Sequence, residues 1–312
     1  MGQKAGVKDG HTTKSESSFG KKLWCVLIVV FLGGIGWQVW KLHLYNNAVR
    51  EAKEAGMHWD CDDTFSLIRQ DWRNALKKET WGAHERRLTL GSVPDLARYR
   101  DLFHRLRPTV LQANDFIDES LDAIKNLTSL QELHLSRCPA LQNLNALDGL
   151  KSLHELDLYA CDALQNVDGI KGLTGLRALG LSHCPILQDV SSIKGLTSLQ
   201  VLDLSEGTAL KNLKVIKELT NIHELVLFRC AALQNLNGLK NLATLQEIDL
   251  CACNALQNVD GLKGLTGLQT LDLSGCDKIP AAALRELRAA LPNTDITFPD
   301  GSNNPPQLES AP

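Results

Sequence analysis

The stretch from residue 127 to 264 decides the fold, because it repeats one 23-residue line six times without slippage. Its first two lines read LTSLQELHLSRCPALQNLNALDG (127–149) and LKSLHELDLYACDALQNVDGIKG (150–172). Four more begin at Leu173, Leu196, Leu219 and Leu242, and a seventh begins at Leu265 before it departs from the pattern. A fixed period of this length predicts a solenoid, in which each repeat packs only on its neighbours.

These lines follow the pattern LxxLxxLxLxxCxxLxxLxxLxx, so the chain resembles the leucine-rich repeat family in its cysteine-containing form. The resemblance implies an α/β solenoid, a horseshoe arc with a parallel β-sheet on its concave side, and a role in protein recognition. The strand of each repeat is the LxL portion, such as Leu133-His134-Leu135. Alternation sends the leucines inward and the residues between them outward. We call the outward face of this sheet the concave face.

Composition limits the function classes. Hydrophobic residues make up 44% of the 312-residue chain but aromatic residues only 5%, which predicts a core of stacked aliphatic side chains. The net charge of −3 gives no general attraction to nucleic acid, so no nucleic-acid partner is expected.

The cysteines form a column and not a disulfide framework. Regular 23-residue spacing and the absence of CxxC and HxxxH pairs argue against disulfides and metal binding, and we predict no metal or cofactor. The family resemblance implies that each thiol hydrogen-bonds a carbonyl of the adjacent coil. Gly207 replaces cysteine in the fourth line, which predicts a looser coil, and Cys251 is expected as an exposed thiol on the concave face. The column contains six of the nine cysteines: Cys138, Cys161, Cys184, Cys230, Cys253 and Cys276.

The N-terminal part of the chain predicts a membrane anchor. Residues 1–20 read as a disordered tail, and 21–42 contain the uncharged run from Leu23 to Trp40. As a helix this run spans about 27 Å, against a hydrocarbon core of about 30 Å. A cleaved signal peptide is the alternative, but no small-x-small site follows the run, which favours an uncleaved anchor. Four lysines before the run and three basic residues after it favour a cytoplasmic N-terminus and extracytoplasmic repeats.

Residues 43–102 are predicted to form a helical juxtamembrane spacer that caps the solenoid. A capped amphipathic helix is expected from Asp63, and the tryptophans of this segment are interpreted as packing residues or, alternatively, as partner contacts. The repeat domain is expected over 103–298, with about eight repeats. Its first repeat is an imperfect one from Phe103 that places Asn114 in the cysteine column and Ile117 on the leucine pattern. Residues 280–291 predict a capping α-helix followed by a closing strand, and 299–312 a disordered tail.

The concave face is predicted to bind protein. Two of its columns are rich in acidic residues, and Tyr159 and Phe228 depart from an otherwise small-residue third column. Aromatic side chains supply contact area at interfaces. The predicted binding residues are Glu132, His134, Glu155, Asp157, Tyr159, Asp203, Glu224, Phe228, Glu247 and Asp249.

The charge stripes have two open explanations. Like charges stacked at about 5 Å repel each other by about 1 kcal/mol even in water, so the stripes do not serve stability. They are either functional or copied by duplication of the repeat. A second stripe lies on the loop side and consists of Lys171, Lys194, Lys217, Lys240 and Lys263.

Three function classes follow from these patterns. The first is a single-pass, membrane-anchored module whose concave face is expected to recognise a protein or peptide of basic character. The alternative is a structural envelope scaffold that self-assembles by pairing the acidic face with the lysine stripe of a neighbour. The third is an enzyme, which we do not expect, because no phosphate loop, catalytic triad or metal spacing is present in the sequence.

Overall fold

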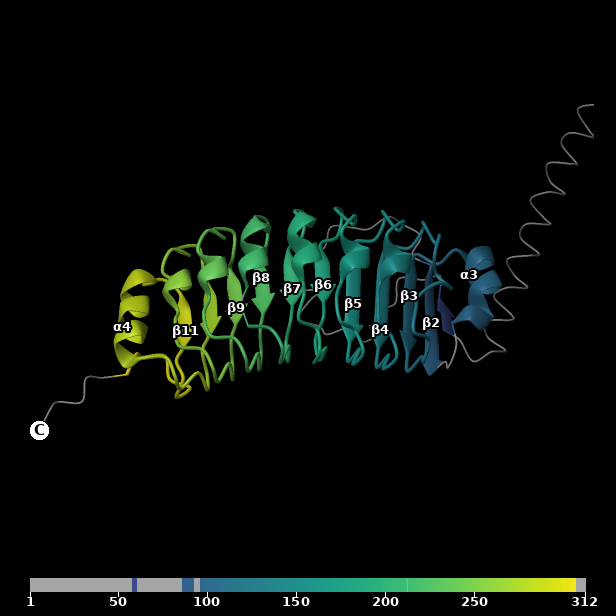
Figure 1. Ribbon diagram of the computed structural model, residues 1–312. Coiled ribbons are helices and arrows are strands. Elements are labelled where there is room, and N and C mark those ends of the chain that lie inside the picture. The colour runs from purple at the N-terminus through teal and green to yellow at the C-terminus, as the bar shows by residue number, and fades with distance from the viewer. Residues whose placement is uncertain (1–57, 61–85, 93–95, 212, 307–312) are drawn as a thin grey trace, which may run out of the picture. The chain divides into compact units, whose positions relative to one another are not determined.

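The computed structural model describes residues 58–60, 86–92, 96–211 and 213–306 (Figure 1). The chain divides into two units, Met1–Ala48 and Val49–Pro312, and all described residues belong to the second unit. The predicted tail 1–20, the predicted membrane segment 21–42 and the helix expected from Asp63 lie outside the described residues. Within the described part, every helix is too short or too polar to span a bilayer.

A single sheet of eleven strands runs through the described unit in chain order. β1 pairs antiparallel with β2, and the ten strands from β2 to β11 are parallel, as the repeat pattern predicted. The strands are β1 (His58–Asp60), β2 (Arg87–Ser92), β3 (Val110–Asn114), β4 (Glu132–Ser136), β5 (Glu155–Tyr159), β6 (Ala178–Gly180), β7 (Val201–Asp203), β8 (Glu224–Val226), β9 (Glu247–Asp249), β10 (Thr270–Asp272) and β11 (Asp295–Thr297).

Each full repeat returns to the next strand through a short 3-10 helix on the other side of the core (Figure 1). The leucines between sheet and helical turns are buried; Leu133, Leu156 and Leu225 have no exposed surface. Burying one such side chain contributes roughly 1.5–3 kcal/mol, so the stacked leucine columns supply most of the driving force. The 3-10 helices are η1 (Ala97–Tyr99), η2 (Asn145–Leu147), η3 (Asp168–Ile170), η4 (Ser191–Gly195), η5 (Lys214–Glu218), η6 (Asn237–Leu239) and η7 (Asp260–Leu262).

The N-terminal end of the solenoid differs from the prediction. Strand register pairs Asn114 with Ser136, which places Asn114 on the concave face and not in the cysteine column. The buried side chain of Phe116 occupies the cysteine position, while Ile117, expected inside, is 62% exposed. Equivalent positions of the first and second repeats are therefore 22 residues apart. The predicted first repeat of 24 residues assigned Asn114 and Ile117 to the wrong positions.

The sheet also begins earlier than expected. β2 lies within 43–102, a segment predicted to be helical, and Leu88 and Leu90 on β2 are fully buried. The short run RLTL (87–90) alternates polar and apolar residues as a strand does. It occurs once and does not match the repeat pattern, so the sequence alone predicts no strand upstream of residue 103. α3 (Arg100–Leu106) follows η1 and buries Phe103, so the predicted domain boundary falls inside a helix.

The C-terminal end forms as predicted as far as β11. α4 (Ala281–Ala290) starts after Pro280 and buries Leu284 and Leu287, and β11 adds the closing parallel strand. The expected disordered tail begins later than 299, because the backbone N–H of Phe298 donates to Ser302 at 2.7 Å and Arg285 donates to the carbonyl of Pro306.

The cysteine column has the predicted structural role in four coils. The thiols of Cys230, Cys253 and Cys276 donate to leucine carbonyls of the preceding coil at 3.2, 3.1 and 3.1 Å, and that of Cys184 does so at 3.7 Å. Gly207 interrupts the column as expected. The prediction of a looser coil at Gly207 is wrong: a Cβ atom there would lie 2.7 Å from the Leu210 side chain and 2.9 Å from the carbonyl oxygen of Leu204, so neighbouring atoms fill the space.

Candidate functional site

The strand register brings the predicted binding residues into the expected columns on the concave face. Glu132 lies beside Glu155, and Glu224 beside Glu247, in the first column. His134 lies beside Asp157 in the second column, which also contains Asp203 and Asp249. The columns differ along their length, and the face divides into three parts with different burial and charge.

At the β4–β5 end, a histidine is buried among carboxylates. The His134 side chain is 3% exposed, and its Nε2 lies 3.5 Å from Glu132 Oε2 and 3.9 Å from Glu155 Oε1. Burial alone lowers the pKa of His134, but the contact with Glu132 and the charges of Glu155 and Asp157 outweigh it, so the pKa is raised above 6.5. This end of the face therefore holds a buried imidazole whose surroundings favour its protonated form.

At the centre, over β6 and β7, the face is closed. Ala178 and Val201 are 0% and 1% exposed, and Asp203, predicted as a binding residue, is only 1% exposed. The Asp203 carboxylate accepts hydrogen bonds from the hydroxyls of Ser182 at 2.6 Å and Ser205 at 2.5 Å. Asp203 is thus committed to internal contacts and does not belong to the exposed surface that we predicted.

The second-column aspartates also have a local structural role that sequence reasoning missed. One carboxylate oxygen of each accepts the backbone N–H two residues later: Ser205 to Asp203, Cys251 to Asp249 and Ser274 to Asp272, all at 2.8 Å. Such contacts shape the turn that leaves the strand. The signal was the recurring LDLS sequence, which the family uses often, so part of this acidic column is structural.

Over β8–β11 the face is open and forms an acidic groove of about 310 Å³. Burial and the nearby carboxylates of Asp272 and Asp203 raise the pKa of Asp249, although the N–H of Cys251 opposes this. Burial is the larger cause of this raised pKa, and repulsion from the neighbouring carboxylates adds to it. Asp295 on β11, which sequence reasoning did not assign to the face, completes it. The acidic lining residues are Glu224, Glu247, Asp249, Asp272 and Asp295.

The two aromatic residues of the third column lie in a mixed-charge edge. The Tyr159 ring meets His183 edge-on at 4.9 Å, and the Arg229 guanidinium lies 4.8 Å from the centre of the Phe228 ring. Glu206 joins them, with its Oε1 3.0 Å from His183 and 4.0 Å from Arg229. The sequence predicted both aromatic residues on this face, whereas the contacts that Glu206 makes with His183 and Arg229 appear only in the structure.

A left-handed backbone residue follows the third column in every coil. His183, Glu206 and Arg229 have φ of 56°, 57° and 55°. Each N–H donates to the next coil, as in Glu206 to the carbonyl of Phe228 at 2.7 Å. Non-glycine residues rarely adopt this conformation, so the backbone fixes the direction in which these charged side chains leave the sheet. The full series is Asp115, Arg137, Ala160, His183, Glu206, Arg229, Ala252 and Gly275.

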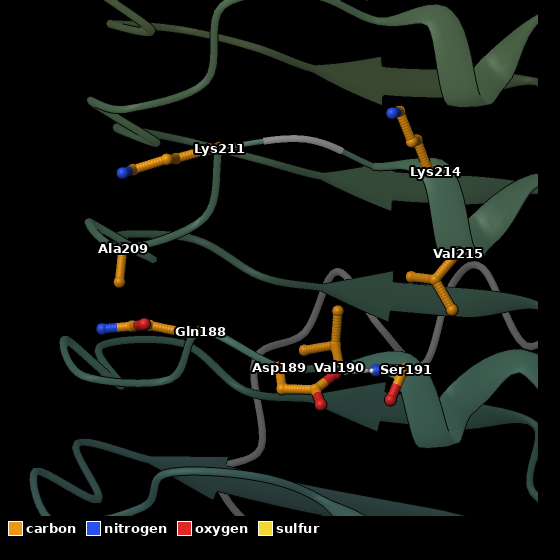
Figure 2. Close-up of a pocket in the computed structure, with 8 residues that line it drawn as sticks. All are labelled: Gln188, Asp189, Val190, Ser191, Ala209, Lys211, Lys214 and Val215. Carbon is orange, nitrogen blue, oxygen red and sulfur yellow. Dashed lines mark hydrogen bonds between the residues drawn. The ribbon is translucent and has the colours of Figure 1, made fainter.

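A second hollow, of about 490 Å³, lies away from the sheet between two coils (Figure 2). Val215 occupies the position that is glycine in the coils of Gly169, Gly238 and Gly261, where neighbouring backbones approach closely. The Val215 side chain lines this hollow. Lys211, Lys214 and Asp189 line the hollow, and the mixed charge indicates no single class of ligand.

Among the described residues, two of the five lysines of the stripe form ion pairs within their own edge. Lys194 lies 3.6 Å from Glu218, and Lys263 lies 2.7 Å from both Asp260 and Glu286. These neighbours reduce the positive charge that the stripe presents to another molecule.

The thiols do not form a reactive centre. Burial raises the pKa of Cys276 to about 12. Cys251 is half-buried, not fully exposed as predicted, and burial together with Asp272 and Asp249 raises its pKa. A nucleophilic cysteine needs a lowered pKa. Within the described part of the chain, no group of three or more His, Cys, Asp or Glu side chains is placed to hold a metal ion.

Comparison with protein families identifies the repeat. The model of the BspA-type leucine-rich repeat region, in six copies, matches residues 128–257 and 180–284, which together cover half of the chain. The chain belongs to the leucine-rich repeat family. Leucine-rich repeat domains are typically protein-binding and not catalytic. No curated protein matches the sequence.

Two solved leucine-rich repeat structures are similar in fold. Internalin C2 of Listeria monocytogenes has 24% sequence identity and a TM-score of 0.50; the match covers 72% of this chain and 90% of that one. The leucine-rich repeat domain of the type III effector XopL has 23% identity and a TM-score of 0.58, with 84% and 94% covered. At these identities the likeness extends to the fold alone.

Proposed function

We propose that this leucine-rich repeat domain binds a basic protein or peptide on its concave face. The observation that carries the proposal is the open acidic groove over β8–β11, to which each strand contributes a carboxylate. A cationic partner would offset the repulsion from Asp272 and Asp203, which adds to the effect of burial in raising the pKa of Asp249. Tyr159 and Phe228, both half-buried, would supply apolar contact area along one edge.

The charge contribution can be tested with a lysine-rich peptide and isothermal titration calorimetry. We expect the double variant Glu224→Gln, Glu247→Gln to bind about tenfold more weakly, because it removes two neighbouring charges from the groove. The matched control is Glu218→Gln with Glu286→Gln, which removes the same charge beside the lysine stripe. Binding that is equally weak in both variants, or insensitive to salt, would reject the groove as the binding site.

The aromatic contribution requires a separate variant. Tyr159→Ala with Phe228→Ala removes both rings and leaves the acidic groove intact. Interface aromatics often contribute 2 kcal/mol or more, so we expect a further loss of roughly tenfold or greater in affinity for a partner that reaches this edge. Unchanged affinity in the double variant would restrict the site to the charged groove.

The anchor at 23–40 belongs to the same proposal. In it, the chain is a single-pass membrane protein with a cytoplasmic N-terminus and extracytoplasmic repeats, supported by the charge-free run and its flanking lysines. Protease added to intact cells should then digest the repeat domain. Protection of the repeats until the membrane is broken would place them on the other side and direct the search for partners there.

A further inference from the structure

The β4–β5 end of the concave face contains a feature that the groove over β8–β11 lacks. His134 is almost completely buried, and neither of its ring nitrogens has a hydrogen-bond partner among the described residues. Buried polar groups are nearly always paired, so an unpaired buried imidazole requires a physical reason.

The surroundings of His134 suit its charged form. Glu132 and Glu155 approach its Nε2 at 3.5 and 3.9 Å, and Asp157 is its neighbour on β5. These separations are those of ion pairs and not of well-formed hydrogen bonds. On the other side, β3 offers the neutral Gln112. Protonated His134 therefore offsets part of the negative charge of three carboxylates. With a neutral ring, the three carboxylates would repel one another without this compensation.

Two further charged or titratable groups among the described residues lie near this cluster. Arg87 on β2 lies 3.8 Å from Glu132, so it shares one of the carboxylates. His154, next to Glu155, has its pKa lowered by burial and by Arg177, and Glu132 only partly offsets this. His134 is thus the member of the cluster that favours its proton.

We propose that His134 makes the β4–β5 end of the concave face a proton-controlled binding site for a cationic group of the partner. The inference rests on the proposed function. A lysine or arginine that approaches Glu132 and Glu155 competes with the charge on His134. Binding therefore releases the proton, and by linkage the affinity rises with pH.

The test compares the wild type with His134→Gln in binding a lysine-rich peptide at about pH 6 and about pH 8.5, on either side of the usual histidine range. We expect the wild type to bind roughly three- to tenfold more tightly at the higher pH, since one partly screened charge is removed. His134→Gln should lose most of this difference. His104→Gln, on the exposed side of α3, is the control and should follow the wild type.

The outcomes separate the two proposals. Equal pH dependence in the wild type and His134→Gln would overturn the inference and leave the proposed function intact. No binding at either pH would overturn the basic partner, and with it this inference. If His134→Gln does not fold, Glu132→Gln keeps the imidazole and removes its nearest carboxylate. The NMR titration of His134 should then shift to lower pH than in the wild type, and an unchanged midpoint would also overturn the inference.

Discussion

At the scale of single residues, the same amino acid serves different purposes at equivalent positions. Asp203 is buried and bonded to two serines, whereas Asp249 lies in the open groove beside Asp272. Both accept a backbone N–H that shapes the strand end. The sequence predicted that these aspartates share a column, because the fixed period sets the register. It could not predict which are covered, because burial depends on side chains from other coils.

The raised pKa of Asp249 makes its effect on stability depend on pH. The folded state holds this proton more tightly than the unfolded state, so stability falls as pH rises through the range above 3.8. Asp249→Asn keeps an acceptor for the N–H of Cys251 and removes the charge. We therefore expect a higher melting temperature than the wild type at neutral pH, with the gain vanishing in acid. The control is Asp162→Asn, an exposed aspartate, which should change little at either pH.

At the scale of elements, glycines set the spacing between coils on the side away from the sheet. A Cβ atom at Gly238 would lie 2.0 Å from the carbonyl oxygen of Leu213, and one at Gly261 would lie 2.0 Å from that of Leu236. Backbone atoms cannot yield by such distances without separating the coils. Val215 stands at the equivalent position of its own coil, where it lines the hollow between two coils (Figure 2).

Gly238→Ala should therefore destabilise the fold strongly, although it adds only one carbon atom. We expect a loss of about 2 kcal/mol or more in the free energy of unfolding, measured with urea, because the added methyl overpacks a backbone contact. Gly264→Ala is the matched control, since its nearest atom would be 3.5 Å away, an ordinary contact. Equal effects of the two substitutions would mean that the coils can separate freely at this position.

Element boundaries were predictable only where the repeat is regular. Six intact lines fixed the strands from β4 to β9, and proline followed by spaced leucines identified α4. Upstream of 127 the lines are imperfect, so the offset of Asn114 and the strand at Leu88 were missed. A single short alternating run has no period to mark it as a strand, and only pairing with β3 gives it that structure.

At the scale of the whole molecule, strand pairing among the described residues joins each coil only to its neighbours along the chain. Stability is then a sum of coils and their interfaces. Removing one complete line, 219–241, should leave a folded protein with a smaller urea m-value, because one coil's surface is no longer exposed on unfolding. Removing only 219–230 should disrupt the fold, because it breaks the register of every later strand. Circular dichroism and urea titration distinguish the two.

The hydrogen bonds made by the left-handed backbone residues all run from one coil to the next, so the array of repeats has a direction. The left-handed residue of each coil donates its backbone N–H to a carbonyl of the next coil. At one end Asp115 donates to the carbonyl of Ser136, and at the other Gly275 donates to the carbonyl of Pro299. β11 is the last strand of the sheet, so no later coil among the described residues offers a carbonyl and the series ends at Pro299. Copies of the repeat could be added or lost upstream of Gly275 while the same C-terminal end, α4 and β11, is retained. Array length is thus free to vary, and with it the reach of the acidic face.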